Sequence, residues 1–323
     1  MPDITGLEKI HGNFKKKDIL SLEQFSTDDI KLLFSHVEHM RDIAVNSQPS
    51  DILKGNVVTL LFYEPSSRTF GSFGAAIKHL GGQTIDIINP QQFSSVVKGE
   101  TLEDTIRVFE SYTDAIVIRH PEAGTAIHAA MAAKNVPIIN AGDGIGEHPT
   151  QALLDLYTIY ETFGRLDNLT ILFTGDILNG RTVHSLMRGL ALYPNNTIYL
   201  LAPTQLQLSS DEKKQFEEKG LTIHLITTEQ DIPPADVWYW TRVQKERFEN
   251  LEEYEKMKHA FVLTQKLLDE KGKQETIVMH PLPKVGEIEK TVDRDPRAIY
   301  LTEEIQNGLY VRMALMGLVL GKL

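Results

Sequence analysis

The chain has 323 residues, of which 41% are hydrophobic and 24% are charged, and it contains no cysteine. The length suits two globular domains of about 150 residues each, and the missing thiols exclude disulfides, thiolate nucleophiles and cysteine-ligated zinc. The formal net charge of −11 argues against a general nucleic-acid or anionic-membrane surface. An anionic substrate would therefore need a local pocket, which makes clustered arginines significant.

The sequence predicts a cytoplasmic protein. Its polar start, followed by Lys15-Lys16-Lys17, lacks the apolar core of a signal peptide. No apolar run approaches the ~18 residues that a membrane span requires. The apolar stretch at 313–320 is short and is typical of a packed terminal helix.

Apolar, β-branched runs alternate with helical patterns along the chain, which predicts parallel sheets with crossover helices. The expected strands are residues 57–63, 84–88, 115–118, 137–139, 170–174, 197–201, 237–239 and 276–279. The predicted fold class is therefore α/β, with two domains that are each a parallel sheet flanked by helices. Ligands bind beyond the carboxyl ends of parallel strands, so the polar clusters that follow these strands mark the expected site.

We place the domain boundary at residue 148, before a helical pattern that starts around Leu153. Residues 1–148 would form the first domain and residues 149–299 the second. The last helix, from about residue 300 to 323, would return to the first domain.

The most informative segment is Ser66-Ser67-Arg68-Thr69, which joins the first expected strand to a helical pattern that stops at Gly81-Gly82. Three hydroxyls and a guanidinium thereby enter the first turn of a helix. Free backbone N–H groups and the helix dipole favour an anion there. Arg68 can hold a phosphate through two parallel hydrogen bonds. The alternative is an N-cap serine beside a solvated arginine.

Other polar residues follow later strands or lie in loops of the first domain. Lys98, beside Gly99 in an expected mobile loop, can reach a site as a point charge. Arg119 follows the third strand. His148 opens a helix, where the dipole favours a neutral imidazole, although a capping or packing role is an equal alternative.

In the second domain, Arg181 starts a helix after the fifth strand, a position that suits a carboxylate ligand. Arg242 and Gln244 share one side of the chain if it stays extended after the seventh strand, and this pair can bind a small dianion. Gly175 and Gly180 do not have the G-x-G-x-x-G spacing of dinucleotide-binding folds, so they are a weak signal for a nucleotide.

Seven segments, in the right order, resemble the aspartate carbamoyltransferase family, a branch of the aspartate/ornithine carbamoyltransferases. They are residues 66–69, 98–101, 119–121, 148–151, 180–185, 241–247 and 280–283. Any one of them is weak evidence, but all seven together are highly specific. One departure is Ser67, where the family usually has threonine; the hydroxyl is kept, so the phosphate cradle should survive.

The resemblance implies transfer of the carbamoyl group of carbamoyl phosphate to the α-amine of L-aspartate, an early step of pyrimidine biosynthesis that needs no metal or organic cofactor. It also implies a homotrimer with shared active sites, to which regulatory or other pathway chains could attach. The implied roles are phosphate binding by Ser66, Ser67, Arg68 and Thr69; contact with the carbonyl oxygen by Thr69, Arg119 and His148; binding of the carbamoyl NH₂ by Gln151 and the backbone carbonyls near Pro281 and Leu282; binding of aspartate by Arg181, Arg242 and Gln244; and entry of Lys98 with Ser94, or Ser95 under a one-residue shift, into the neighbouring subunit's site.

Three alternatives stay open. An ornithine carbamoyltransferase typically has His-Cys-Leu-Pro where residues 280–283 here read His-Pro-Leu-Pro, and Arg242 with Gln244 suits a second carboxylate rather than an ammonium. A dinucleotide-binding oxidoreductase rests only on the fold and on Gly175 and Gly180. A non-catalytic subunit is disfavoured by the intact set of arginines.

Overall fold

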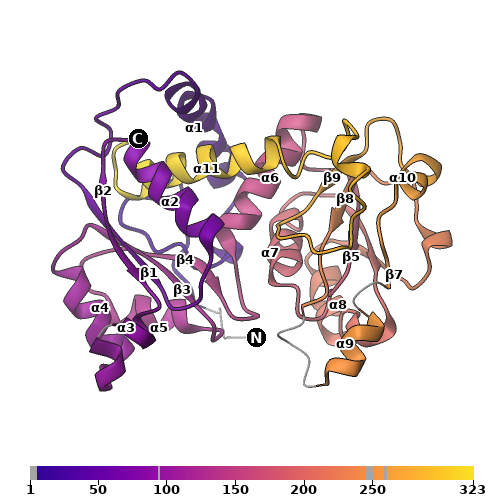
Figure 1. Ribbon diagram of the computed structural model, residues 1–323. Coiled ribbons are helices and arrows are strands. Elements are labelled where there is room, and N and C mark those ends of the chain that lie inside the picture. Colours follow the sequence, from indigo (N-terminus) through magenta and orange to yellow (C-terminus); the bar gives the residue numbers. More distant parts are fainter. Residues whose placement is uncertain (1–5, 94, 245–249, 258–259) are drawn as a thin grey trace. The chain divides into compact units, whose positions relative to one another are not determined.

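The computed structural model describes residues 6–93, 95–244, 250–257 and 260–323 (Figure 1). The chain splits into two compact units, unit 1 with Met1–Tyr157 and Gln306–Leu323, and unit 2 with Thr158–Ile305. Each unit contains one parallel sheet with flanking helices, which confirms the predicted fold class. Among the described residues, none of the helices combines the length and the apolar character that crossing a membrane requires.

Unit 1 is organised around a four-stranded parallel sheet in the order β2-β1-β3-β4. Its strands are β1 (Val57–Phe62), β2 (Gln83–Ile88), β3 (Ala115–His120) and β4 (Ile138–Asp143). The central strands β1 and β3 are almost fully buried, as their continuous apolar runs predict. All four strands end at the same edge of the sheet.

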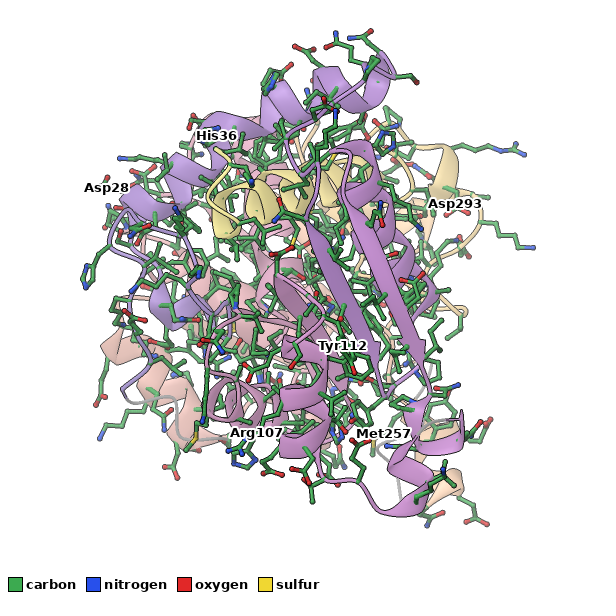
Figure 2. All side chains as sticks on the ribbon, turned by 90° about the vertical axis from the view of Figure 1, so that its left-hand side faces the viewer. Asp28, His36, Arg107, Tyr112, Met257 and Asp293 are labelled. Atoms are coloured by element: carbon green, nitrogen blue, oxygen red, sulfur yellow. The ribbon has the colours of Figure 1, made fainter. Side chains whose placement is uncertain are left out.

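Helices flank the sheet of unit 1 (Figure 1). They are α1 (Thr27–Val45), α2 (Ser67–His79), α3 (Pro90–Phe93), α4 (Leu102–Glu110) and α5 (Thr125–Ala132), with 3-10 turns η1 (Leu22–Gln24) and η2 (Ser95–Lys98). Helix α1 buries one side: Ile30, Leu33 and Val37 are buried, whereas Asp28 is exposed (Figure 2).

Helix α2 ends where the two glycines predict. Its last helical residue is His79, and Gly81 adopts a left-handed backbone with φ 81°. A Cβ atom at Gly81 would lie 2.3 Å from the backbone oxygen of Ser50, so only glycine fits this turn.

Unit 2 contains a five-stranded parallel sheet in the order β7-β6-β5-β8-β9. Its strands are β5 (Thr170–Thr174), β6 (Thr197–Leu201), β7 (Thr222–Ile226), β8 (Val237–Trp240) and β9 (Ile277–Met279). Every strand that the sequence predicts is present in one of the two sheets, with ends that differ by a few residues. The sequence pattern does not predict β7, because this edge strand is largely exposed and lacks a clear apolar run.

The helices of unit 2 are α7 (Arg181–Leu190), α8 (Ser210–Glu218), α9 (Leu251–Met257) and α10 (Gln265–Lys271), with 3-10 turns η3 (Thr204–Leu206), η4 (Glu229–Asp231) and η6 (Val292–Arg294). Trp238 and Trp240 of β8 pack with Tyr300 in a core cluster of buried residues. This core supports the carboxyl ends of β8 and β9.

The division between the units lies inside helix α6 (Pro149–Phe163), after Tyr157, and not at residue 148 as expected. The first turns of α6 pack in unit 1, where the Tyr157 ring lies 5.1 Å from the Phe34 ring of α1. Helix α11 (Glu303–Val319, Figure 1) belongs to unit 1 from Gln306 onward. Arg41 of α1 donates a 3.3 Å hydrogen bond to its Asn307.

Candidate active site

The turn between β1 and α2 places the predicted anion cradle at the carboxyl edge of the unit 1 sheet. Ser66 is the N-cap of α2 with an extended backbone, and within the described chain its side chain receives no capping hydrogen bond. Ser67 and Arg68 are exposed in the first turn, and Thr69 is 7% exposed. Since the first N–H groups of a helix have no intrahelical acceptor, this turn offers donors to an anion.

Arg119 lies next to the anion cradle of residues 66–69, because β3 pairs with β1 and places Arg119 opposite Phe62. Its guanidinium is nearly buried and is held at two points. Nη2 forms a 3.0 Å ion pair with Glu64, and Nη1 donates a 3.1 Å hydrogen bond to the backbone oxygen of Ala141. The structure therefore brings Arg119 to the strand ends where Ser66 to Thr69 begin their helix.

Glu64 is a site residue that the sequence analysis missed. It lies between β1 and the cradle, and its carboxylate is partly exposed while it pairs with Arg119. A carboxylate directly before a phosphate-binding turn was the available signal. Such a group keeps the guanidinium oriented in the absence of an anionic ligand.

His148 lies at the start of α6 and is buried, with 4% of its surface exposed. Its backbone oxygen accepts hydrogen bonds from the N–H groups of Gln151 and Ala152. The preceding loop is held by Asp143, whose carboxylate accepts from the N–H groups of Glu147 at 2.7 Å and Gly124 at 2.8 Å. These bonds hold His148 at the carboxyl end of β4, the same sheet edge as Arg119.

Gln151 has an amide whose orientation the structure determines. Its Nε2 donates a 2.9 Å hydrogen bond to the carboxylate of Asp155, one turn further along α6. Because the amide nitrogen is engaged in this way, Oε1 is the end left to accept from a ligand. The side chain is partly exposed.

In unit 2, the segments that carry Arg181, Arg242 and Gln244 contact one another. Gly175, with φ 119°, directly follows β5, and Thr241 directly follows β8. The two backbones are so close that a Cβ atom at Gly175 would lie 2.2 Å from the backbone oxygen of Thr241. Gln244 donates a 3.1 Å hydrogen bond to the backbone oxygen of Asn179. The start of α7 and the segment after β8 therefore form one edge of the unit 2 sheet, and Arg181 and Arg242 are both partly exposed there.

Pro281 and Leu282 follow β9, the neighbour of β8, so they lie at that same edge. Both are partly exposed, and the N–H of Leu282 donates a 2.7 Å hydrogen bond to Nδ1 of His280. Leu282 has φ 55°, a left-handed conformation that a leucine adopts only where other contacts hold it.

The predicted loop residues are only partly visible. Lys98 ends η2, which packs against α3, and its side chain is exposed. Ser94 lies outside the described residues. Ser95 begins η2, but nothing is described of its side chain.

Two histidines lie near these edges, His120 half-buried and His184 buried. Burial lowers the pKa of His120, which follows Arg119. Burial, together with the charge of Arg188, lowers the pKa of His184 to about 4. His184 is therefore neutral at physiological pH, and its Nε2 lies 2.8 Å from the backbone oxygen of Ile177 in the loop before Arg181. Over the described residues, no cluster of three or more histidine and acidic side chains is arranged to hold a metal ion.

Each unit thus gathers cationic side chains at the carboxyl edge of its own sheet, and in unit 1 the hydroxyls of Ser66, Ser67 and Thr69 join them. In unit 1 the set suits an anion and a developing oxyanion, since Arg68, Arg119 and His148 are donors. In unit 2 the set suits carboxylates, since Arg181 and Arg242 can each form charge-assisted hydrogen bonds.

Two family models match the chain. The model described as "Aspartate/ornithine carbamoyltransferase, carbamoyl-P binding domain" matches residues 17–161, and the one described as "Aspartate/ornithine carbamoyltransferase, Asp/Orn binding domain" matches residues 167–319. Together they cover nearly the whole chain.

Curated relatives are similar over most of the chain. Multifunctional protein pyr1-3 of Dictyostelium discoideum is 48% identical over 94% of this chain, which spans only 14% of that protein's length. Aspartate carbamoyltransferase 1, chloroplastic, of Pisum sativum is 44% identical over 95% of this chain and 79% of its own length.

Solved structures agree with these matches. Aspartate transcarbamoylase from Trypanosoma cruzi, in complex with carbamoyl phosphate and aspartate, has a TM-score of 0.87 and 39% identity, and covers 95% of this chain and 96% of its own. The catalytic subunit of the M. jannaschii aspartate transcarbamoylase has a TM-score of 0.84 and 40% identity, over 93% of this chain and 96% of its own.

Proposed function

The chain belongs to the aspartate/ornithine carbamoyltransferase family, and from this premise we propose the reaction that its residues carry out. It is an enzyme that transfers the carbamoyl group of carbamoyl phosphate to the α-amine of L-aspartate, giving N-carbamoyl-L-aspartate and phosphate. The supporting observation is that both family domains match, each with its basic cluster at the carboxyl edge of its own sheet.

Unit 1 binds the acyl phosphate. Ser66, Ser67, Arg68 and Thr69 hold the phosphate at the first turn of α2. The exposed position of Arg68 and the N-cap geometry of Ser66 support this assignment. One close charge pair is worth about 4 kcal/mol at an effective dielectric near 20, so a few arginines outweigh a diffuse and screened net negative charge.

Thr69, Arg119 and His148 stabilise the carbonyl oxygen of the carbamoyl group. As the amine attacks, negative charge grows on this oxygen, and fixed donors act as an oxyanion site. Arg119 and His148 are buried, so they are already oriented and desolvated before the substrate arrives. Loss of one such donor commonly removes ~10²–10³ in rate.

The carbamoyl NH₂ is held by acceptors. Oε1 of Gln151 is one of them, since Nε2 of Gln151 is engaged by Asp155. The backbone oxygens of Pro281 and Leu282 are the others. In unit 2, Arg181, Arg242 and Gln244 bind the carboxylates of aspartate, which explains the choice of a dicarboxylic acceptor over ornithine.

The chemistry needs one bond made and one broken at the same carbon. The lone pair of the aspartate amine attacks the carbonyl carbon, and the new C–N bond forms as the C–O bond to phosphate breaks. Departing phosphate takes the proton that the amine releases, so no protein base is required. A pH–rate study with alternative leaving groups that revealed an essential protein base would contradict this step.

The experiment that tests the function compares acceptors. Purified protein is supplied with carbamoyl phosphate and either L-aspartate or L-ornithine, and the ureido product is measured by its colour reaction. Product with aspartate alone supports the proposal, whereas product with ornithine alone, or with neither, contradicts it. A titration of NADH followed by fluorescence tests the dinucleotide-binding alternative.

We also propose that Lys98 and Ser94 enter the active site of a neighbouring subunit, which requires a homotrimer. Other chains of the pathway could attach to this homotrimer. The cytoplasmic location also stays a prediction, and the Pisum sativum relatives are named chloroplastic.

A further inference from the structure

The loop after β9 is held by a buried histidine. His280 is 2% exposed and its ring contacts the loop at both nitrogens. The N–H of Leu282 donates to Nδ1 at 2.7 Å, and Nε2 lies 2.7 Å from Oε1 of Glu287. Because Nδ1 accepts, the ring proton sits on Nε2 and is donated to Glu287.

Glu287 completes the arrangement from the other end of the loop. Its second oxygen, Oε2, accepts a 2.9 Å hydrogen bond from the N–H of Val285. Although burial raises the pKa of Glu287, the hydrogen bonds from His280 and the backbone hold that pKa below its ordinary value. The carboxylate is therefore ionised and accepts at both oxygens, so the two side chains clamp residues 282 and 285.

Two further contacts, independent of the clamp, hold this loop at its start and in its middle. The N–H of His280 donates a 2.9 Å hydrogen bond to Glu304. Lys284 pairs at 2.7 Å with Asp293, which also accepts a 2.6 Å hydrogen bond from the hydroxyl of Tyr300 (Asp293 is labelled in Figure 2). What the clamp adds is the direction of the peptide group between Pro281 and Leu282, next to the left-handed backbone of Leu282.

We propose that His280 and Glu287 are positioning residues that set the acyl specificity of the enzyme. The N–H of Leu282 shares a peptide group with the Pro281 oxygen, so its bond to Nδ1 aims that oxygen at the place of the carbamoyl NH₂. The bond from the Val285 N–H to Glu287 holds the far side of the segment that carries the Leu282 oxygen. An acyl group with a methyl in place of NH₂ leaves these oxygens without a donor and is rejected, since a buried acceptor without a partner is costly. This inference rests on the proposed function.

The test compares carbamoyl phosphate with acetyl phosphate, which has a methyl group at that place. With saturating aspartate, kcat/KM is measured for both acyl phosphates. The readout, called the acyl ratio, is kcat/KM for carbamoyl phosphate divided by kcat/KM for acetyl phosphate. In His280→Gln the amide can still donate to Glu287, but the acceptor for the Leu282 N–H is lost. In His280→Asn the side-chain oxygen lies near the former Nδ1 and keeps that acceptor.

We expect His280→Gln to lower the acyl ratio about tenfold or more, because a small displacement of groups at a reacting centre has a large effect on rate. His280→Asn should keep most of the acyl ratio of the unmodified enzyme. Glu287→Gln loses one of its two acceptors and should lower the ratio to a smaller extent. This variant carries the test if His280→Gln does not fold. Equal losses with both acyl phosphates in the variants would show a structural role only and overturn the inference.

His184→Gln is the matched control. It replaces another buried histidine of unit 2 that contacts a backbone oxygen, that of Ile177. The acyl ratio of His184→Gln should equal that of the unmodified enzyme. A fall in this ratio as large as the fall in His280→Gln would count against the inference. If the unmodified enzyme forms no ureido product at all, the proposed function itself is wrong, a result distinct from an unchanged ratio.

Discussion

Arg68 is the residue on which the phosphate assignment depends most directly. Arg68→Ala should lower kcat/KM by at least ~10²-fold, because a bidentate, charge-assisted contact with the phosphate is lost. Stability should change little, since the side chain is exposed. Steady-state kinetics and a thermal unfolding curve measure both effects.

Lys78→Ala is the control for Arg68→Ala, because Lys78 is an exposed cation near the other end of the same helix. It should leave turnover unchanged. Near-normal turnover in Arg68→Ala would show that the first turn of α2 does not hold the phosphate.

His184 predicts a pH dependence of stability. Its pKa is about 4 in the folded protein, below the ordinary 6.5, because burial disfavours the charged ring. Protonation therefore favours the unfolded chain. The contribution of His184 is fully present above pH 6.5 and is lost as pH falls from about 6.5 toward 4, up to about 3 kcal/mol.

Denaturant titrations between pH 7 and 4 check this for the unmodified enzyme and for His184→Gln, whose amide can still donate to Ile177. The variant should lose less stability over that range. Parallel curves would mean that other groups cause the acid loss.

At the scale of elements, α11 is tied to the two helices that begin at the candidate site. Arg312 of α11 is 4% exposed, and its Nη1 donates to Ser72 of α2 at 3.0 Å and to the backbone oxygen of Gly308 at 3.2 Å. Its guanidinium lies 5.3 Å from the centre of the Phe73 ring. Burial lowers the pKa of Arg312 to about 10, while Asp155 of α6 acts to raise it.

Arg312→Leu should therefore destabilise the protein by about 3–5 kcal/mol, because it removes two hydrogen bonds and leaves the buried charge of Asp155 without the guanidinium that offsets it. Arg312→Lys keeps the charge but not the planar fork, and should recover part of this loss. Equilibrium unfolding measures both. A loss below about 1 kcal/mol in Arg312→Leu would show that packing alone holds the three helices together.

At the scale of the whole molecule, the proposed homotrimer makes a prediction about mixtures. If Lys98 serves a neighbouring subunit, Arg68→Ala and Lys98→Ala are each inactive alone, but a reassembled mixture contains sites with both native residues. Random assembly of equal amounts should restore about a quarter of the activity, since each shared site draws on two subunits independently. Activity after dissociation and reassembly is the measurement.

Mixtures of each variant with itself serve as controls for the reassembly step. If the mixed sample stays as inactive as these controls, each site is complete within one chain, and the assignment of Lys98 to a partner is wrong.

Much of the fold follows from local pattern. The apolar runs predict every strand except β7, and the glycines at 81 and 82 predict the end of α2. The cradle at 66–69 needs no tertiary information, because a strand followed by small hydroxyl residues and a helix already determines a set of free N–H groups.

The sequence by itself determined the family, the fold class and the kinds of side chain at each strand end, because periodicity and motif order are local properties. Only the tertiary structure decided which groups meet: Glu64 with Arg119, Gln244 with Asn179, and His280 with Glu287. These partners depend on sheet order, on register and on the path of loops, which hydrogen bonds between distant residues determine and which no residue spacing reveals.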